Sequence, residues 1–277
     1  EPSEETTEEV DGTEKLSFDF SENLKLVVYQ GDLTKENADV IVAPANDRLQ
    51  HKDDAAEAIV KAGGRSIQEE IVIIMWKKGN QPFQAGEVIA TGGGQLLCKF
   101  LVHAICPVWS HYAPNTAKQM LNNAVTNSLD LACRYNATSI SMPAIGAGLP
   151  QVPINICAEV LFEAVENFAS HAEKMSSLRE IRFVTFDKPT NRVFVQEMEK
   201  RFPGSVTREK IEVFLPSDTK KHERQTQITS IPDSDHDQTT ISSFIYGSHC
   251  PRSDENENKA RFSLDSYAAA AEELFNT

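Results

Sequence analysis

The chain has 277 residues, 40% of them hydrophobic and 25% charged, and it carries a formal net charge of −14. This apolar content is sufficient to bury a sizeable core. The acidic balance argues against a general DNA or RNA binder, because phosphate backbones attract clustered Lys and Arg side chains. We therefore expect no nucleic-acid partner.

The cysteines and histidines predict neither a disulfide scaffold nor a metal site. The five cysteines are scattered, no C-x-x-C pair is present, and the seven histidines form no metal-ligand spacing with them. Reduced thiols of this kind indicate a cytosolic or nuclear compartment. We also expect no membrane association, because no apolar run reaches the length of a membrane span and the first residues are acidic. The cysteines are Cys98, Cys106, Cys133, Cys157 and Cys250.

Both ends of the chain are predicted to be disordered. Residues 1–22 contain nine acidic residues and one basic residue, Lys15, and such a segment repels itself and lacks the apolar residues for a core. Residues 204–277 are polar and show little periodicity, apart from a short helical pattern over 269–274 that would be marginal alone. A single folded domain is therefore predicted over residues 23–203.

Strand and helix signals alternate between these ends. Runs rich in Val and Ile predict strands, and apolar residues at helical spacing predict helices. Several strands are apolar throughout, which favours a central sheet covered on both faces. In chain order we predict strands 24–30 and 39–45, helices 53–63 and 65–79, strands 86–94 and 99–105, helix 115–136, strand 139–143, helix 152–170, strand 180–186 and helix 190–202.

Four predicted strands are followed by residues that suit a ligand site. Asp32 in "QGDLT", Asn46 in "VAPAND", the loop 145–149 in "SISMPAIGAGLP" and Phe186 in "VTFD" all lie where a strand ends. In open α/β folds, ligands bind at the carboxyl ends of strands. Each feature also has a plain alternative: a turn or cap for the polar and glycine residues, and a core position for Phe186. Taken one at a time, these signals leave both interpretations open.

The glycine-rich loop has a specific chemical use. Backbone N–H groups in such a turn can converge on phosphate oxygens, helped by the dipole of the helix that follows. Ile145, Gly146, Ala147, Gly148 and Leu149 would let a ligand approach the backbone closely. The loop is therefore either a phosphate cradle or a tight turn.

The order of these motifs resembles the macrodomain family. "GDLT", "PAN", "LVHAICPVW", "SISMPAIGAGLPQVP" and "RFVTFD" follow one another over residues 24–202, most like the macrodomains of some poly(ADP-ribose) polymerases. The resemblance implies an α/β fold, a three-layer α/β/α sandwich around a central mixed sheet. It also implies that the ligand is ADP-ribose or an ADP-ribosylated protein, with no further cofactor, and that the glycine-rich loop cradles the diphosphate.

The resemblance also assigns roles to residues of this chain. Asp32 would hold the adenine amino group, Leu33 would pack near the base, and Phe186 would stack on it. Asn46 would contact the distal ribose. The remaining predicted binding residues are the diphosphate amides of Gly146, Ala147 and Gly148, together with Ile145, Leu149 and Asp187.

One segment departs from the family pattern. A glycine run usually follows the Asn motif, but "HKDD" occupies that place here, with Lys52, Asp53 and Asp54 instead of glycines. Two carboxylates near a diphosphate repel it, by about 1 kcal/mol at ~4 Å in water. Reduced affinity is therefore expected. The alternative is a degenerate macrodomain that serves as a protein-interaction scaffold.

Catalysis is not expected. Hydrolytic family members use an Asp in the first turn of the helix that follows, and the matching residue here is Ala56. A general base must lie within hydrogen-bonding distance of its water, and no candidate is evident. Cys106 and Cys157 have no His or Asn partner in the sequence. A hydrolase is therefore the least favoured of the three functions.

Three other features receive structural or weak interpretations. His103 lies on an apolar strand and is predicted to be a buried structural histidine, whereas His51 is a minor candidate for ribose contact. "TGGG" at 91–94 is a turn, because it lacks the spacing of a dinucleotide-binding fingerprint. In the tail, Gln238, Ile241 and Phe244 have the spacing of a sliding-clamp-binding motif, which chance also produces in such segments.

Overall fold

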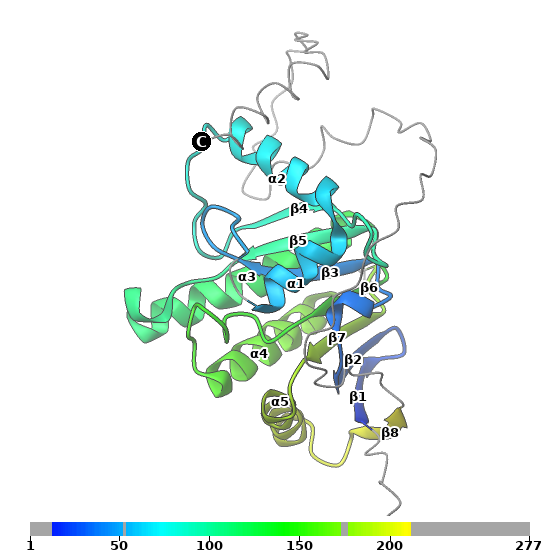
Figure 1. Cartoon of the computed structure of the whole chain (residues 1–277). Coiled ribbons are helices and arrows are strands. Elements are labelled where there is room, and N and C mark those ends of the chain that lie inside the picture. Colours follow the sequence, from blue (N-terminus) through cyan, green and yellow to red (C-terminus); the bar gives the residue numbers. More distant parts are fainter. Residues whose placement is uncertain (1–12, 52–53, 173–176, 212–277) are drawn as a thin grey trace, which may run out of the picture.

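The computed structural model describes residues 13–51, 54–172 and 177–211 (Figure 1). They form the predicted α/β sandwich around one mixed sheet. The strands are β1 (Thr13–Ser21), β2 (Leu24–Gln30), β3 (Val40–Ala45), β4 (Val88–Gly92), β5 (Phe100–Ile105), β6 (Ser139–Met142), β7 (Glu180–Thr185) and β8 (Thr207–Ile211). The helices are α1 (Asp54–Gly63), α2 (Arg65–Lys77), α3 (Pro114–Arg134), α4 (Ile154–Ala172) and α5 (Lys188–Arg201), with 3₁₀ turns at Leu33–Lys35 (η1) and Trp109–His111 (η2).

The strand order of the sheet creates a common edge for the predicted site. The order is β4-β5-β3-β6-β7-β2-β1-β8, and the five strands from β5 to β2 run parallel to one another. The outer pairs, β4–β5, β1–β2 and β1–β8, are antiparallel. Parallel strands end at the same edge, so the loops that follow β2, β3, β5, β6 and β7 gather there.

Helices cover both faces of the sheet and create two separate cores. In β3, Val40 and Val42 belong to the core that includes residues of α3, α4 and α5, whereas Ile41 and Ala43 belong to the core that includes residues of α1 and α2. Successive side chains of a strand point to opposite faces, so a central strand needs apolar residues at every position. This is the reason for the unbroken apolar runs in the sequence.

The first strand corrects the predicted boundary of the domain. Residues 13–21 were expected to be disordered, but they form β1 and pair with β2. Apolar and charged residues alternate here: Leu16 is buried, whereas Asp19 is exposed. The ring of Phe18 stacks on that of Phe202 with centroids 3.8 Å apart. The acidic residues were misleading because they occupy the outward positions of a half-buried strand.

The last strand is a second correction. Residues 207–211 were placed in a disordered tail, but they form β8, which pairs with β1 from Thr13↔Ile211 to Ser17↔Thr207. Its exposed, charged residues give no apolar signal, and Arg208 forms an ion pair with Glu14 across the strands (3.0 Å). The predicted helix at 269–274 and the sliding-clamp spacing at 238–244 lie outside the described residues.

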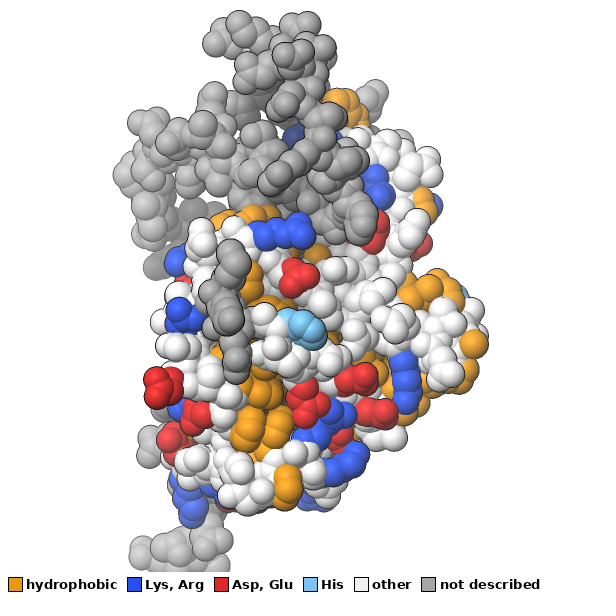
Figure 2. Space-filling model, turned by 180° about the vertical axis from the view of Figure 1, so that it is seen from behind, with side chains coloured by type: hydrophobic (Ala, Val, Ile, Leu, Met, Phe, Trp, Pro, Cys, Tyr) orange, Lys and Arg blue, Asp and Glu red, His pale blue; other side chains and the backbone are white. Residues whose placement is uncertain are grey.

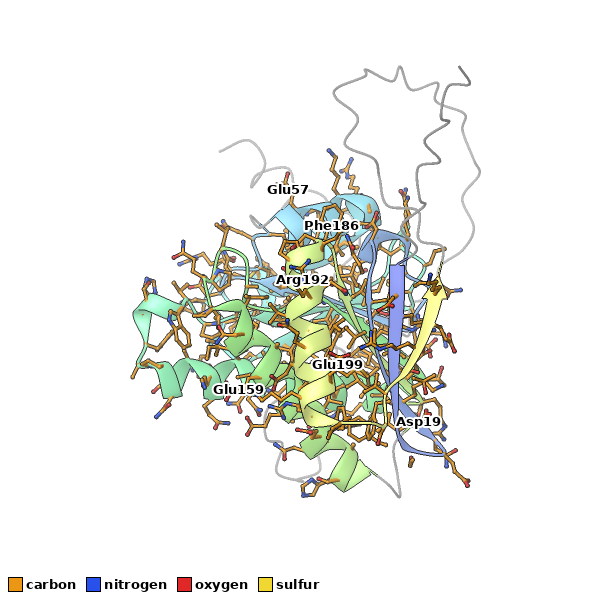
Figure 3. All side chains as sticks on the ribbon, turned by 90° about the horizontal axis from the view of Figure 1, so that it is seen from below. Asp19, Glu57, Glu159, Phe186, Arg192 and Glu199 are labelled. Carbon is orange, nitrogen blue, oxygen red and sulfur yellow. The ribbon has the colours of Figure 1, made fainter. Side chains whose placement is uncertain are left out.

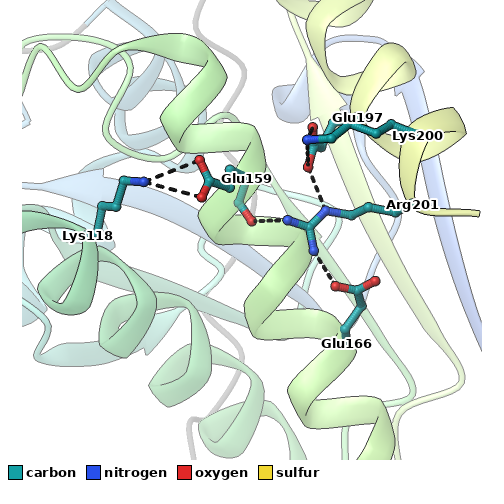
Figure 4. A network of polar contacts seen from close by, with 6 residues as sticks. All are labelled: Lys118, Glu159, Glu166, Glu197, Lys200 and Arg201. Carbon is teal, nitrogen blue, oxygen red and sulfur yellow. Dashed lines mark hydrogen bonds and ion pairs between the residues drawn. The ribbon is translucent and has the colours of Figure 1, made fainter. Parts of the chain in front are cut away.

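A polar network joins the three helices on one face of the sheet (Figure 4). Arg201 of α5 donates to Glu197 of its own helix (2.6 Å) and to the backbone carbonyl of Glu159 in α4 (3.1 Å), and it also contacts Glu166. The carboxylate of Glu159 accepts from Lys118 of α3 (3.3 Å). Charge-assisted bonds of this kind are stronger than neutral ones, and they lock α3, α4 and α5 together.

Charged side chains of both signs are mixed on the face that Figure 2 shows. Lys and Arg side chains there lie among Asp and Glu side chains rather than in one basic patch. Among the described residues, no group of three His, Cys, Asp or Glu side chains is placed to hold a metal ion. None of the helices described in residues 13–211 is long and apolar enough to cross a membrane.

Candidate ligand-binding site

The predicted site residues meet at one edge of the sheet. Asp32, Asn46 and Phe186 directly follow or lie just beyond the ends of β2, β3 and β7, and the glycine-rich loop follows β6. Figure 3 shows Phe186 at the beginning of α5, at the same end of the molecule as Glu57 of α1, with Glu199 further along α5. The parallel strand order therefore gathers residues that are far apart in the sequence.

Asp32 caps the turn that begins the site. Its Oδ1 accepts from the Thr34 backbone N–H (2.9 Å) and from the Thr34 hydroxyl (2.7 Å), which orders η1. An Asp at this capping position satisfies amides that the turn leaves unpaired. Leu33 follows and is buried in the apolar core. Asp32 therefore acts as a cap, which was one of the two roles open from the sequence. Both hydrogen bonds from Thr34 go to Oδ1.

Phe186 is not a core residue. Its side chain is 62% exposed at the end of β7, although a phenyl ring on a strand is more often buried. Its backbone carbonyl accepts from Gln30 Nε2 (3.0 Å), which ties the end of β7 to the end of β2. The next residue, Asp187, caps α5 by accepting from the Thr190 N–H (2.8 Å). A hydrogen-bonded backbone therefore presents an exposed aromatic ring at the end of β7, the strand that pairs with β2.

The backbone of the glycine-rich loop has a conformation that requires glycine at its centre. Gly146 has a φ of 91°, in the left-handed region that glycine adopts readily, and a Cβ there would lie 3.2 Å from Val152. The Ala147 N–H donates to the Ala144 carbonyl within the turn (3.1 Å). Among the described residues, neither Gly146 nor Gly148 donates its N–H to a backbone carbonyl. Within the described residues, these two of the three predicted amides thus have no backbone acceptor.

The same loop is tied to its neighbour and carries an exposed apolar tip. The Trp109 N–H in the segment after β5 donates to the Pro150 carbonyl (2.8 Å). Ile145 is buried beneath the loop, whereas Leu149 is 59% exposed at the tip. Of the two apolar residues predicted to take part in binding, Ile145 supports the loop from below and Leu149 reaches the surface.

Asn46 organises its own loop. Its Oδ1 accepts from the backbone N–H groups of Arg48 (3.0 Å) and Gln50 (2.8 Å), so the side chain acts as a turn former. Its Nδ2 lies 3.5 Å from Gln50 Oε1, at the outer limit of a hydrogen bond, and therefore remains a donor that a ligand could take over. Leu49, with a φ of 56°, is buried beneath this loop.

A histidine pair ends this loop. His51 Nε2 lies 2.9 Å from His103 Nδ1, and His103 Nε2 lies 3.0 Å from Thr91 Oγ1. His103 is completely buried, as predicted. Burial lowers the pKa of His51 to about 4, and burial and the neighbouring His51 hold the pKa of His103 well below its ordinary value. Both rings are therefore neutral near pH 7.

A charged cluster that sequence reasoning missed lies directly after the Asp32 turn. Glu36 accepts from the Tyr29 hydroxyl (2.6 Å), the Ser141 hydroxyl (3.0 Å) and Arg182 (3.2 Å), and Arg182 also donates to Glu180 (2.7 Å). Burial and the charge of Glu36 raise the pKa of Tyr29. One signal was available: a charged residue such as Arg182 within an apolar strand needs a partner.

The remaining predictions concern the glycines, the cysteines and the departure from the family pattern. Gly93 is in a tight turn, where a Cβ would lie 2.2 Å from the Cys98 carbonyl oxygen. Burial raises the pKa of Cys98 to about 11 and also raises that of Cys157, which disfavours the reactive thiolate.

Residues 52–53 lie outside the described part of the chain, and α1 begins at Asp54. Ala56, in the first turn of α1, is buried.

The family model of the Macro domain matches residues 42–161. The chain is 32% identical to the "Macro domain-containing protein TTE0995" of Caldanaerobacter subterraneus, over 65% of this chain and 98% of that protein. The chain therefore belongs to the macrodomain family. It is also 32% identical to the mouse "Protein mono-ADP-ribosyltransferase PARP9", over 60% of this chain but only 19% of that protein, and 30% identical to human PARP14 over 10% of its length.

Solved structures share the fold. A structure titled "Oceanobacillus iheyensis macrodomain with ADP" matches with a TM-score of 0.63 and 24% identity, over 68% of this chain and 97% of that chain. A "Trypanosoma brucei macrodomain in complex with ADP-ribose" matches with a TM-score of 0.52 and 20% identity, over 62% and 68% of the two chains. At these identities the likeness establishes the fold alone.

Proposed function

We propose that this macrodomain binds ADP-ribose, free or attached to a protein, and does not hydrolyse it. One observation carries the proposal: an acidic turn, an exposed aromatic ring and a glycine-rich loop, two of whose amides have no backbone acceptor among the described residues, meet at one edge of the sheet. Each group suits one part of a nucleoside diphosphate. The macrodomain structures of Oceanobacillus iheyensis with ADP and of Trypanosoma brucei with ADP-ribose support this choice of ligand.

Adenine recognition would rest on Asp32 and Phe186. The carboxylate of Asp32 uses Oδ1 for the Thr34 cap, so Oδ2 can accept from the exocyclic amino group of adenine. The exposed Phe186 ring provides a face for stacking, which is worth about 1–3 kcal/mol per base. Leu33 supports the turn from the core.

The diphosphate would lie over the glycine-rich loop. The amides of Gly146 and Gly148 would donate to its oxygens, while Ala147 closes the turn. A side chain at Gly146 would crowd Val152 and force a strained φ, so the loop keeps its shape only with glycine there. The N-terminus of α4 follows the loop, and its dipole favours an anion.

The distal ribose would lie beside the Asn46 loop, with Asn46 Nδ2 as a donor. Lys52, Asp53 and Asp54 follow directly in the sequence, where the family pattern has glycines. We infer that their two carboxylates weaken binding of the diphosphate end by about 1 kcal/mol, an effect that Lys52 partly offsets.

Absence of hydrolysis is part of the proposal. The position that resembles the catalytic Asp of hydrolytic macrodomains is Ala56, whose buried methyl group cannot accept a proton. His51 ends the loop before α1, and its Nε2 is engaged by His103. In keeping with the sequence-based expectation, we propose that the protein acts in the nucleus or cytoplasm.

A second function is favoured by one observation, the carboxylates of "KDD". If their repulsion is strong enough, the domain would serve as a protein-interaction scaffold without ADP-ribose. Calorimetric titration of the full chain with ADP-ribose, and with AMP and ADP for comparison, separates the two. Micromolar binding of ADP-ribose, lost in Asp32→Ala, supports the reader. No heat and no thermal stabilisation at millimolar ligand would instead favour the scaffold.

A further inference from the structure

A buried hydrogen-bonded chain links the Asn46 loop to the sheet. It runs from Thr91 in β4 through His103 in β5 to His51, the last described residue of the loop before α1. Both distances, 3.0 and 2.9 Å, are ordinary hydrogen-bond lengths. This is the side-chain link that ties residue 51 to the neighbouring strand, across 52 positions of sequence.

In this row of hydrogen bonds, the proton positions on the two imidazole rings depend on each other. A neutral imidazole has one donor nitrogen and one acceptor nitrogen, and both nitrogens of His103 are engaged. The Thr91 hydroxyl donates its one proton to the Gly92 carbonyl (3.1 Å), so it accepts from His103 Nε2, and His103 Nδ1 is left to accept from His51 Nε2. Removing the nitrogen of His51 therefore leaves a completely buried polar atom of His103 without its partner.

We propose that His51 is a positioning residue for the distal half of the ligand site. Through His103 it holds the end of the Asn46 loop against the sheet, and so sets the affinity for the diphosphate and second ribose but not for the adenosine part. The inference rests on the proposed function. The chemical class of the affected ligand portion is an anionic sugar phosphate beyond the first phosphate group.

The selectivity follows from how the two ends of the loop are held. Its beginning continues from β3, and Asn46 Oδ1 binds the Arg48 and Gln50 amides within it. Its end depends on His51, because residues 52–53 then lead to α1. The adenine end is supported separately by Glu36, which follows η1, and by Arg182 of β7, a strand that lies on the other side of β6 from β3. Loss of the hydrogen bond between His51 and His103 is therefore expected to displace the Asn46 loop and to leave the adenine half in place.

Two amide variants test the role of His51 with closely matched chemistry. Gln has about the reach of histidine Nε2 and can donate or accept, so His51→Gln keeps the bond to His103. Asn is one methylene shorter, so His51→Asn loses it. Both are measured in the full chain by calorimetric titration with ADP-ribose and, separately, with AMP.

We expect His51→Asn to weaken ADP-ribose about five- to tenfold, the effect of one lost hydrogen bond with a stranded partner, and to leave AMP within about twofold. His51→Gln should remain within about threefold of the wild type for both ligands. Equal weakening of AMP and ADP-ribose by His51→Asn, or no weakening of either, would overturn the positioning role.

Hydrogen exchange separates this inference from the proposed function. If the wild type binds neither ligand, the reader function fails, and the loop is then judged without ligand from the Gln50 amide, which donates to Asn46 Oδ1. The control is the Gly31 amide, which donates to the Thr185 carbonyl (2.9 Å) in the adenine half. Faster exchange at Gln50 in His51→Asn than in His51→Gln, with exchange at Gly31 unchanged, supports the link. Equal exchange at Gln50 in both variants overturns it, and this measurement still applies if Asn lowers the melting temperature.

Discussion

The two halves of the ligand site are built in different ways. Asp32 and Phe186 follow β2 and β7, which are direct neighbours in the sheet, and a charged cluster around Glu36 lies beneath them. The Asn46 loop instead rests on a neutral histidine pair and its own backbone bonds. Charge-assisted bonds are roughly twice as strong as neutral ones, so the adenine half is the more firmly held of the two.

This difference explains how the family pattern can change in one half and persist in the other. Residues joined by an ion-pair network are strongly coupled, and removing one strands the rest. A loop with few partners tolerates new side chains, such as those of Lys52, Asp53 and Asp54. We expect mutations to act through these two halves independently.

The largest expected effect is on the adenine half. Asp32→Ala should weaken both AMP and ADP-ribose about thirty- to a hundredfold, because a hydrogen bond to a charged acceptor is worth about 1.5–3 kcal/mol. Asp32→Asn is the matched control, since Asn keeps the cap on Thr34. Calorimetry that finds only ADP-ribose affected in Asp32→Ala would contradict the assignment of Asp32 to adenine.

The free energy of unfolding is expected to depend on pH through His51, which lies in the distal half of the site. The pKa of His51 is about 4 in the folded protein and about 6.5 when unfolded, so the unfolded chain binds more protons between these values. The contribution of His51 to stability is therefore full above pH 6.5 and is lost as the pH falls toward 4, by about 3 kcal/mol.

Urea unfolding of the wild type and His51→Gln at pH 4.5 and 7.5 isolates this contribution from that of the carboxyl groups. The wild type should lose more stability than His51→Gln on acidification. The reverse order, or parallel losses in the two proteins, would show that His51 is not held neutral by the fold.

Phe186→Ala tests stacking with little effect on the fold. Because the ring is exposed, its loss should leave the free energy of unfolding within about 0.5 kcal/mol. Affinity for AMP and for ADP-ribose should fall about tenfold alike, and Phe186→Trp should retain it. An unfolding free energy that falls by several kcal/mol would indicate a packing role instead.

The smallest expected effect is on ligand affinity in the distal half of the site. Replacing Lys52, Asp53 and Asp54 with glycines should strengthen ADP-ribose about fivefold and leave AMP unchanged, because the removed carboxylates repel only the diphosphate end. Calorimetric titration of the variant and the wild type with ADP-ribose and with AMP measures the change in affinity for each ligand. Stronger binding of AMP would mean that the segment acts on the whole site rather than on its distal half.

Much of this architecture was available from the residues alone. Apolar runs and helical spacing predicted the strands and helices from β2 to α5, because local periodicity reports which faces an element buries. The chemistry of the loops was also visible: an Asp, an Asn, a glycine-rich turn and an aromatic residue at four strand ends. What the order of motifs added was the prediction that these loops belong to one site.

Only the tertiary structure decided the edges of the sheet and the supports of the site. β1 and β8 carry outward charges and pair residues as distant as Thr13 and Ile211, which no local pattern reveals. The same is true of His51 with His103 and of Glu36 with Arg182. Such pairs form because parallel strands bring distant segments to one place, where a buried polar group is stable only beside its partner.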